Sequence, residues 1–200
     1  MEDKLLQSLI PDRPKGMILR EEEIELIVEA IWDTYDNCKL LIFGTGNDSS
    51  FWAEVNRYGR NIFLENQQKW IDKTLADNPE LEIHKVDYHT KLSDWKKYSK
   101  MDKIDSLTIT IPEEVMDIKW DVIIVDGPTG RDTRSYRKEY GEEPHGRMSS
   151  IYMAHKLIAD NGTVFIHDIT RKPEQYFGEL LFGKPKQIMS YLGMYKKECK

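Results

Sequence analysis

Residues 40–46 of this 200-residue chain read Leu40-Leu41-Ile42-Phe43-Gly44-Thr45-Gly46, an apolar run that ends in a glycine-containing turn. Four consecutive apolar residues that end at a glycine are typical of a short strand buried on both faces of a parallel sheet. Glycines allow the chain to turn sharply and to pass close to a ligand, because no Cβ stands in the way. We therefore expect a strand at 40–43, a glycine turn at 44–46 and a helix at 50–58.

The same pattern of a short β-forming run that ends at polar residues recurs along the chain. It predicts further strands at 61–64, 81–86, 120–125 and 163–166, and helices at 21–35, 67–76, 92–101, 149–159 and 173–181. Strands that alternate with helices predict an α/β fold with a doubly wound, mostly parallel sheet. The tail at 186–197 carries β-formers broken by Gly193 and predicts an antiparallel hairpin on one sheet edge. The β-like stretch 107–111 has no assigned place.

The composition is that of a soluble globular protein. Hydrophobic residues make up 40% of the chain and charged residues 32%. With 29 Lys and Arg against 35 Asp and Glu, the net charge is −6, which argues against a protein that coats nucleic acid or an anionic membrane. The longest apolar runs are far shorter than the roughly 20 residues that a membrane helix needs. We therefore expect no nucleic-acid and no membrane partner.

The cysteines and the N-terminus bear on compartment and domain organisation. Cys38 and Cys199 lie near opposite ends of the chain and no CxxC spacing occurs, so a disulfide scaffold and a cysteine zinc site are both disfavoured. A reducing, cytoplasmic location is expected. Residues 1–16 end in a turn containing Pro and Arg and are interpreted as an N-terminal arm, and residues 17–200 as a single domain.

The glycine turn and an acidic residue after it predict a nucleoside site. Glu65 lies 21 residues after Gly44, at the end of the second predicted strand. A carboxylate there can accept hydrogen bonds from both ribose hydroxyls. Ser49 stands where a dinucleotide fingerprint has its third small residue, so a single nucleoside such as S-adenosylmethionine fits better than NAD. The alternative is a tight turn with Gly46 and an unrelated surface glutamate.

Polar residues at two further strand ends predict a second site. Asp126 ends the strand at 120–125, and His167 and Asp168 end the strand at 163–166. These ends lie side by side on the ligand face of a doubly wound sheet. Two carboxylates and an imidazole can hold a divalent metal that lowers the pKa of a hydroxyl group, or one of them can act as a general base. The alternative is that Asp126 caps the next turn and His167 packs against the sheet.

Arginines gather in and around the long polar segment 129–145. Arg131, Arg134 and Arg137 lie inside it, Arg147 follows it, and Arg171 comes just after the fifth strand. Long loops at strand ends often carry function, and arginine binds carboxylates through two parallel hydrogen bonds. An acidic acceptor is therefore expected. A solvated charged loop is the alternative for the three arginines inside the segment.

Several of these residues fall in motifs that resemble the plant glucuronoxylan 4-O-methyltransferase family of xylan-modifying enzymes. The motifs are LIFGTGNDS (41–49) with Trp52, FLE (63–65), YHTK (88–91), WDVIIVDGPTG (120–130), EPHGRM (143–148) with Ile151 and Tyr152, and VFIHD (164–168). The resemblance runs from about residue 16 to the end of the chain.

The resemblance implies a Rossmann-like, S-adenosylmethionine-dependent O-methyltransferase that acts on the 4-hydroxyl of glucuronic acid units with the help of a divalent metal. On this basis the cofactor site comprises Gly44, Gly46, Asp48, Ser49 and Glu65. Asp126, His167 and Asp168 are assigned to catalysis and to the metal. Arg147, Tyr152 and Arg171 are assigned to an acceptor that carries a carboxylate.

Two other functions remain open. One is an O-methyltransferase for another small hydroxyl compound such as a catechol, although Thr129 stands where such enzymes have a lysine three residues after the first aspartate. The other is a non-catalytic adenosyl-binding protein, which would have no need of the set Asp126, His167 and Asp168. A nucleic-acid methyltransferase is disfavoured, because neither a broad basic surface nor an NPPY-like motif is evident.

Overall fold

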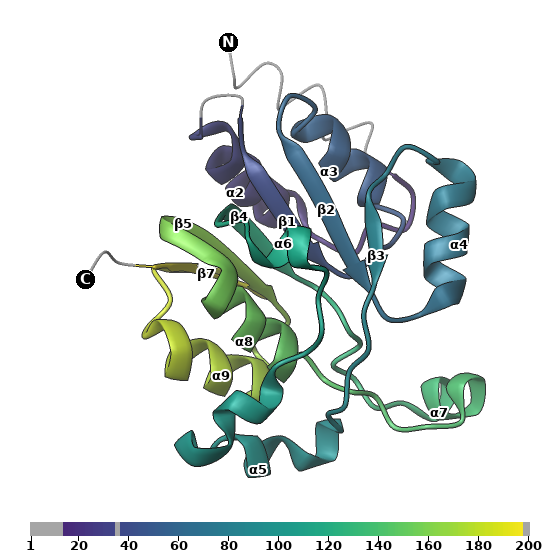
Figure 1. Ribbon diagram of the computed structural model, residues 1–200, viewed down its shortest axis with the longest axis vertical. Coiled ribbons are helices and arrows are strands. Elements are labelled where there is room, and N and C mark those ends of the chain that lie inside the picture. Colours follow the sequence, from purple (N-terminus) through teal and green to yellow (C-terminus); the bar gives the residue numbers. More distant parts are fainter. Residues whose placement is uncertain (1–13, 35–36, 198–200) are drawn as a thin grey trace.

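A computed structural model describes residues 14–34 and 37–197 of the chain, which form a seven-stranded sheet with helices on both faces (Figure 1). The strand order is β3-β2-β1-β4-β5-β7-β6. Most of the predicted N-terminal arm and Cys199 lie outside the described residues.

The first five strands are parallel and the last two form an antiparallel hairpin at the sheet edge, as the sequence predicts. The strands are β1 (Lys39–Phe43), β2 (Arg60–Glu65), β3 (Ile83–Lys85), β4 (Trp120–Val125), β5 (Ile158–His167), β6 (Gln187–Met189) and β7 (Leu192–Lys196). The fold class is therefore confirmed.

Helices cover both faces of the sheet. Helices α2 (Glu21–Trp32) and α3 (Ser49–Val55) pack on one face, and α8 (Met148–Leu157) and α9 (Lys172–Phe182) on the other. The remaining helices are α4 (Gln68–Asp77), α5 (Trp95–Tyr98), α6 (Glu113–Met116), α7 (Arg134–Tyr140), and the 3₁₀ segments η1 (Leu92–Asp94) and η2 (Met101–Leu107).

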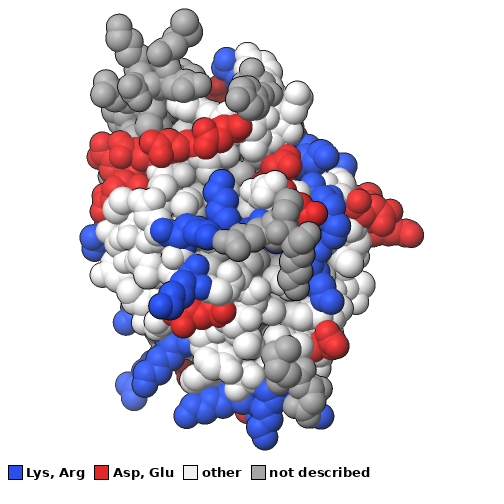
Figure 2. Space-filling view, turned by 90° about the vertical axis from the view of Figure 1, so that its left-hand side faces the viewer, with Lys and Arg blue, Asp and Glu red and all other residues white. Residues whose placement is uncertain are grey.

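The surface separates charges into patches. In Figure 2 a band of Asp and Glu lies in the upper part of the face, while Lys and Arg gather toward its middle and lower edge. The protein therefore has local basic regions although its net charge is −6. Among the described residues, every helix is too short or too polar to cross a membrane. The cytoplasmic location stays a prediction.

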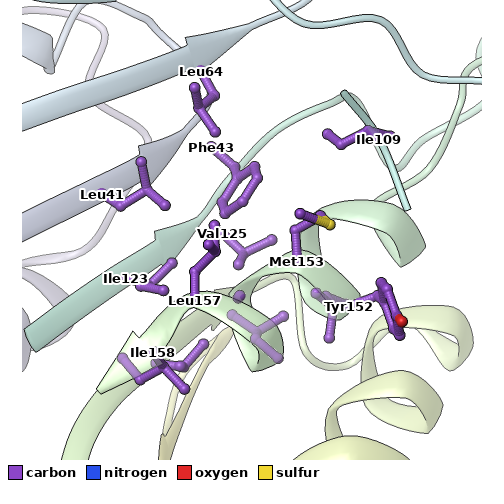
Figure 3. Close-up of a cluster of buried hydrophobic side chains, with 14 of the residues drawn as sticks. Leu41, Phe43, Leu64, Ile109, Ile123, Val125, Tyr152, Met153, Leu157 and Ile158 are labelled. Atoms are coloured by element: carbon purple, nitrogen blue, oxygen red, sulfur yellow. The ribbon is translucent and has the colours of Figure 1, made fainter. Parts of the chain in front are cut away.

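The central strands explain why the runs of apolar residues are continuous. Successive side chains of a strand point to opposite faces, so both faces must be apolar when helices cover both. Leu41 and Phe43 pack in the cluster that includes α8 (Figure 3). Leu40 and Ile42 pack in the cluster that includes α2. The second of these clusters also contains the buried Cys38.

The structure differs from the predicted elements where short-range patterns are ambiguous. The predicted helix 21–35 ends at Trp32, and position 35 lies outside the described residues. The predicted strand 81–86 is limited to Ile83–Lys85. The predicted helix 149–159 ends at Leu157, because Ile158 already pairs with Trp120 in the sheet.

Three further segments differ in kind. The predicted helix 92–101 is divided among η1, α5 and η2. The polar segment 129–145 contains helix α7, whose first turn is capped by the Thr133 hydroxyl. Gly193 lies inside β7 and does not break the hairpin, which turns at Ser190 and Tyr191. The stretch 107–111 is not a strand: Leu107 ends η2, and Ile109 and Ile111, in irregular chain, are buried in the same cluster as residues of α8.

Candidate functional site

A cavity opens at the carboxyl ends of β1, β2 and β4, where the chain turns at Gly44. Gly44 has a φ of 113°, and a Cβ there would lie 3.1 Å from the backbone nitrogen of Gly127, so this position requires glycine. We call this space the carboxylate cavity. Its lining includes Gly44, Gly46, Asp48, Ser49, Trp52, Phe63, Glu65, Trp70, Asp126, Arg147 and His167.

Glu65 braces the glycine turn from the neighbouring strand. Its carboxylate accepts a hydrogen bond from the Thr45 backbone N–H at 3.0 Å and one from the Gln67 N–H at 2.7 Å. Burial raises the pKa of Glu65, although these hydrogen bonds act in the opposite direction. The Thr45 hydroxyl also donates to this carboxylate at 3.4 Å, but a carboxylate has about four lone pairs, so Glu65 can still accept from a ligand hydroxyl in the cavity.

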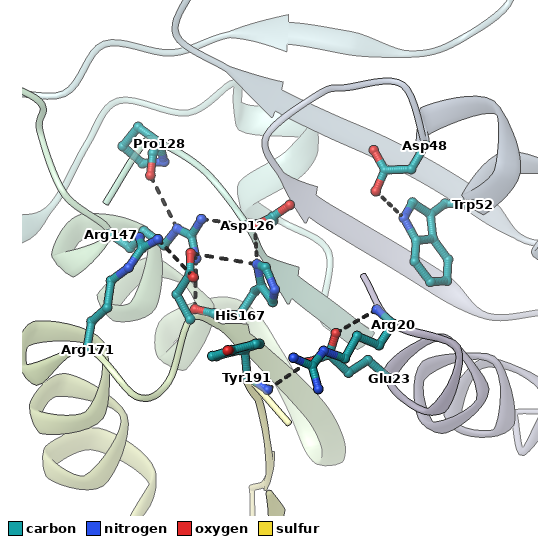
Figure 4. Close-up of polar contacts among 11 residues, drawn as sticks. Arg20, Glu23, Asp48, Trp52, Asp126, Pro128, Arg147, His167, Arg171 and Tyr191 are labelled. Carbon is teal, nitrogen blue, oxygen red and sulfur yellow. Dashed lines mark hydrogen bonds and ion pairs between the residues drawn. The ribbon is translucent and has the colours of Figure 1, made fainter. Parts of the chain in front are cut away.

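The other predicted cofactor residues shape the same turn. The Ser49 hydroxyl accepts a hydrogen bond from the Gly46 N–H at 3.0 Å, so Ser49 closes the turn from within. The Asp48 carboxylate accepts from the Trp52 indole N–H at 2.9 Å (Figure 4). Burial and the nearby charge of Asp126 raise the pKa of Asp48, which shows that negative charge is concentrated here. A positively charged ligand would relieve this repulsion.

Arg147 lies at the junction of the second predicted cluster and is 5% exposed. Its Nη2 donates to Asp126 Oδ1 at 2.9 Å, and its Nη1 lies 2.7 Å from the His167 carbonyl and 2.9 Å from Asp168 Oδ2. Its Nε donates to the Pro128 carbonyl (Figure 4). The predicted role of Arg147 in gripping an acceptor carboxylate does not fit, because its guanidinium is engaged inside the protein.

His167 and Asp126 form a hydrogen-bonded pair. The His167 Nδ1 and Asp126 Oδ1 atoms are 2.9 Å apart, and the imidazole is 7% exposed. Burial on its own would lower the pKa of His167, but the hydrogen bond and charge of Asp126 outweigh it and raise the pKa above its usual value. Burial also acts to raise the pKa of Asp126, but Arg147 and His167 keep this pKa below its usual value. Asp126 therefore stays ionised and fixes the orientation of the ring.

Asp126, His167 and Asp168 also have the donor atoms of a metal site. One ligand atom each from Asp126, His167 and Asp168 lies within 4.8 Å of the others, a spacing that a divalent cation could bridge. However, Asp126 Oδ1 and Asp168 Oδ2 both contact the buried guanidinium of Arg147, and Asp168 Oδ1 lies 2.8 Å from Arg171 Nη2. A cation between these carboxylates would lie against a guanidinium of the same charge. The residues in this arrangement do not fit a divalent metal.

A second, wider space adjoins the carboxylate cavity and shares Asp126, Thr129, Arg147 and His167 with it. We call it the arginine cleft, because Arg20, Arg131, Arg147 and Arg171 line it. Three aspartates also line the cleft, and each is paired: Asp126 with Arg147, Asp168 with Arg147 and Arg171, and Asp132 with Arg137. Within residues 14–34 and 37–197, neither Arg20 nor Arg131 forms a direct ion pair with a carboxylate. Arg20 donates instead to the Ser190 hydroxyl, which in turn donates to Glu22.

The structure brings most of the predicted site residues together. The five predicted cofactor residues line the carboxylate cavity, and Asp168 and Arg171 line the arginine cleft. Tyr152 lines neither: it is 3% exposed and its hydroxyl donates to Asp105 at 2.6 Å. Five residues along a helix correspond to a rotation of about 140° from Arg147, so Tyr152 points to another side of α8. Its predicted role in acceptor binding does not fit this position.

Sequence reasoning missed several lining residues. Trp70 of α4 lines the carboxylate cavity, and its aromatic side chain in the helix after the acidic residue was an available signal. Arg20, Tyr136 and Tyr191 line the arginine cleft. The sequence around Tyr191 carries no signal of a functional role, because the pairing of β7 with β5 is what brings Tyr191 to the site.

Known proteins match both the sequence and the fold. The family model described as IRX15/IRX15L/GXM matches residues 22–110 and 105–190. Glucuronoxylan 4-O-methyltransferase 3 of Arabidopsis thaliana is 35% identical over 177 residues, which cover 79% of this chain and 56% of the relative. Arabinogalactan O-methyltransferase 2 of the same plant is 33% identical over 189 residues, covering 82% and 62%. The chain thus spans little more than half the length of these relatives.

Two further comparisons concern the range of the family and the fold. Protein IRREGULAR XYLEM 15 of Arabidopsis thaliana, whose name states no reaction, is 30% identical over 165 residues, covering 71% of this chain and 48% of the relative. The crystal structure of a methyltransferase-like protein from Silicibacter pomeroyi has a TM-score of 0.51 and 18% identity, covering 93% of this chain and 89% of that one. This structural likeness shows a Rossmann-like methyltransferase fold.

Proposed function

The chain belongs to the IRX15/IRX15L/GXM family, and from this premise we propose that it is an S-adenosylmethionine-dependent O-methyltransferase. The proposed acceptor is a saccharide that carries a uronic acid, with the 4-hydroxyl of a glucuronic acid unit as the methylated group. The observation that carries the proposal is the meeting of two cavities of different charge at the pair Asp126–His167.

The carboxylate cavity suits a cationic methyl donor. S-adenosylmethionine supplies a methyl group on a positively charged sulfur and becomes a neutral thioether once that methyl has been transferred. Asp48, Glu65 and Asp126 place three carboxylates around the cavity against one arginine, Arg147. The same carboxylates would repel the phosphates of a dinucleotide. Glu65 is placed to accept from the ribose hydroxyls, because it follows the glycine turn on the neighbouring strand.

His167 is the proposed general base. Its Nδ1 is held by Asp126, which leaves Nε2 as the proton acceptor for a hydroxyl group at the junction of the two cavities. As the acceptor oxygen forms its bond to the methyl carbon, the hydroxyl proton passes to His167 Nε2 and the carbon–sulfur electron pair stays with sulfur. Ionised Asp126 stabilises the imidazolium that results. No step requires a metal between Asp126 and Asp168.

The arginine cleft suits an anionic acceptor. Arg131 lies in its lining without an ion pair among the described residues, whereas the guanidinium of Arg147 already contacts Asp126 and Asp168. An arginine fork matches a carboxylate with two parallel hydrogen bonds. The names of the relatives, which state glucuronoxylan and arabinogalactan, support a polysaccharide as the acceptor.

A transfer assay with methyl-labelled donor tests the proposal. The acceptors are a xylo-oligosaccharide with a glucuronate branch, the same oligosaccharide without it, and a catechol. We expect transfer to the uronate-bearing acceptor, and we expect His167→Ala to lower kcat by at least about 10²-fold while donor affinity is unchanged. The control is His84→Ala, at the edge strand β3.

Equal transfer to the neutral oligosaccharide or to the catechol would contradict the proposed acceptor. Tight binding of the donor without transfer to any acceptor would instead identify a non-catalytic adenosyl-binding protein.

A further inference from the structure

The rim of the arginine cleft carries a contact between the two ends of the described chain. Arg20 precedes helix α2, and Tyr191 lies in the turn between β6 and β7 (Figure 4). The guanidinium carbon of Arg20 lies 4.9 Å from the centre of the Tyr191 ring, and Arg20 Nη1 donates to the Ser190 hydroxyl at 3.2 Å. We call Arg20 and Tyr191 the rim platform.

A buried carboxylate holds the rim platform in place. Glu23 is fully buried, and its two oxygens accept hydrogen bonds from the Arg20 backbone N–H at 2.8 Å and the Tyr191 backbone N–H at 2.7 Å. The Tyr191 carbonyl in turn accepts from the Ile169 N–H at 2.9 Å. The backbone under the platform is therefore fixed before any ligand binds, which reduces the entropy lost on binding.

The platform is open to a ligand and lies beside the reacting group. The Tyr191 side chain is 44% exposed. Its neighbour Leu192 pairs with His167 across adjacent strands, which are about 5 Å apart. Tyr191 and His167 line the same cleft, Tyr191 from the turn between β6 and β7 and His167 from the end of β5. A ligand that reaches both must therefore extend beyond the group that is methylated.

We propose that the rim platform binds a second sugar unit of the acceptor, next to the unit that is methylated. This inference rests on the proposed function. The flat face of a sugar ring, with its C–H groups, stacks on the ring of Tyr191, and Arg20 donates to the sugar's hydroxyl or carboxylate oxygens. The platform thus makes the enzyme select an oligosaccharide over a single uronic acid.

The chain provides its own matched control. Arg57 lies over the ring of Tyr58 at 4.7 Å, and Tyr58 is 67% exposed, yet neither residue lines the arginine cleft. The two pairs have the same chemistry and differ in position. An effect seen at Tyr191 and not at Tyr58 is therefore an effect of the cleft.

The experiment compares Tyr191→Ala, Tyr191→Phe, Arg20→Gln and Tyr58→Ala. KM and kcat are measured with a glucuronate-bearing xylo-oligosaccharide and with free glucuronic acid, after melting curves confirm folding. We expect Tyr191→Ala to raise KM for the oligosaccharide about tenfold and to affect free glucuronic acid much less. Tyr191→Phe should restore most of the lost affinity, because the ring remains. Tyr58→Ala should behave as wild type.

An unchanged KM for the oligosaccharide in Tyr191→Ala, or an equal change in Tyr58→Ala, would overturn the inference. The failure of the proposed function has a different signature, since no acceptor would then be methylated by the wild-type chain. In that case calorimetric binding of the oligosaccharide decides the role of the platform: loss in Tyr191→Ala supports it, and equal binding overturns it.

Discussion

Arg147 shows how one buried residue sets the chemistry of those around it. Its guanidinium contacts Asp126 and Asp168, and it also donates to the carbonyl of His167. Its positive charge balances the negative charges of the two carboxylates. It therefore lowers the pKa of Asp126, although burial acts to raise it. An ionised Asp126 is what makes His167 a stronger base than an isolated buried histidine.

The rate of methyl transfer should depend on pH through the protonation of His167. His167 must be neutral to accept a proton, and its pKa is raised by Asp126, so the rate of methyl transfer should rise with pH through a value above the 6.5 of an ordinary histidine. Asp126→Asn removes the charge that raises this pKa. The acid limb of kcat should therefore move to lower pH, while the plateau falls by about 10²-fold or more.

The control for this prediction is Asp121→Asn. Asp121 lies at the opposite end of β4, where its carboxylate accepts from the Lys39 backbone N–H. Its variant should leave the acid limb in place. An acid limb that stays in place in Asp126→Asn would mean that another group is the base.

Methyl transfer should not require a divalent metal ion. Because Arg147 lies between Asp126 and Asp168, a strong chelator should leave both methyl transfer and donor affinity unchanged. Metal analysis of the chelated protein should then find less than one equivalent of any divalent ion. Loss of activity that a single added divalent ion restores would show that Arg147 gives way to a metal, and that the arrangement seen here is incomplete.

At the scale of elements, the C-terminal hairpin is joined to helix α2 by hydrogen bonds: the Ser190 hydroxyl donates to Glu22, and the buried Glu23 accepts from the Tyr191 backbone. Glu23 belongs to the first turn of α2 and accepts hydrogen bonds from the backbone of Arg20 and of Tyr191. Glu23 thereby caps the N-terminus of its own helix. It also supplies a hydrogen-bond acceptor to the hairpin turn, 168 residues away in the sequence. Without this carboxylate two partly buried N–H groups would lose their acceptor.

Replacement of Glu23 tests this joint. Glu23→Ala should lower the free energy of unfolding by about 2–4 kcal/mol, since each unsatisfied group costs about 1–3 kcal/mol. Glu23→Gln keeps one acceptor oxygen and should fall between Ala and wild type. Glu21→Ala, at an exposed position of the same turn, should cost under about 1 kcal/mol. Denaturant titration measures all three, and equal values for Glu21→Ala and Glu23→Ala would contradict the role of Glu23.

At the scale of the whole molecule, the sequence predicts what depends on local pattern. The apolar runs at 40–43 and 120–125 indicate strands covered on both faces, and residues at strand ends, such as Glu65 and His167, were placed correctly because parallel strands share one carboxyl edge. The partners of Arg147 could not be predicted, because they come from two segments distant from it in the sequence, 126–128 and 167–168. The rim platform could not be predicted either, because it needs both the pairing of β7 with β5 and the contact of the β6–β7 turn with the start of α2.

The acidic lining of the carboxylate cavity also bears on product release. Asp48, Glu65 and Asp126 attract the donor partly through its sulfonium charge, and that charge disappears in the proposed reaction. The spent donor therefore loses part of its electrostatic attraction at the moment it must leave. A new donor molecule, which is positively charged at sulfur, therefore binds the acidic cavity more strongly than the neutral thioether does. The three carboxylates that attract the donor thus also limit inhibition by the product.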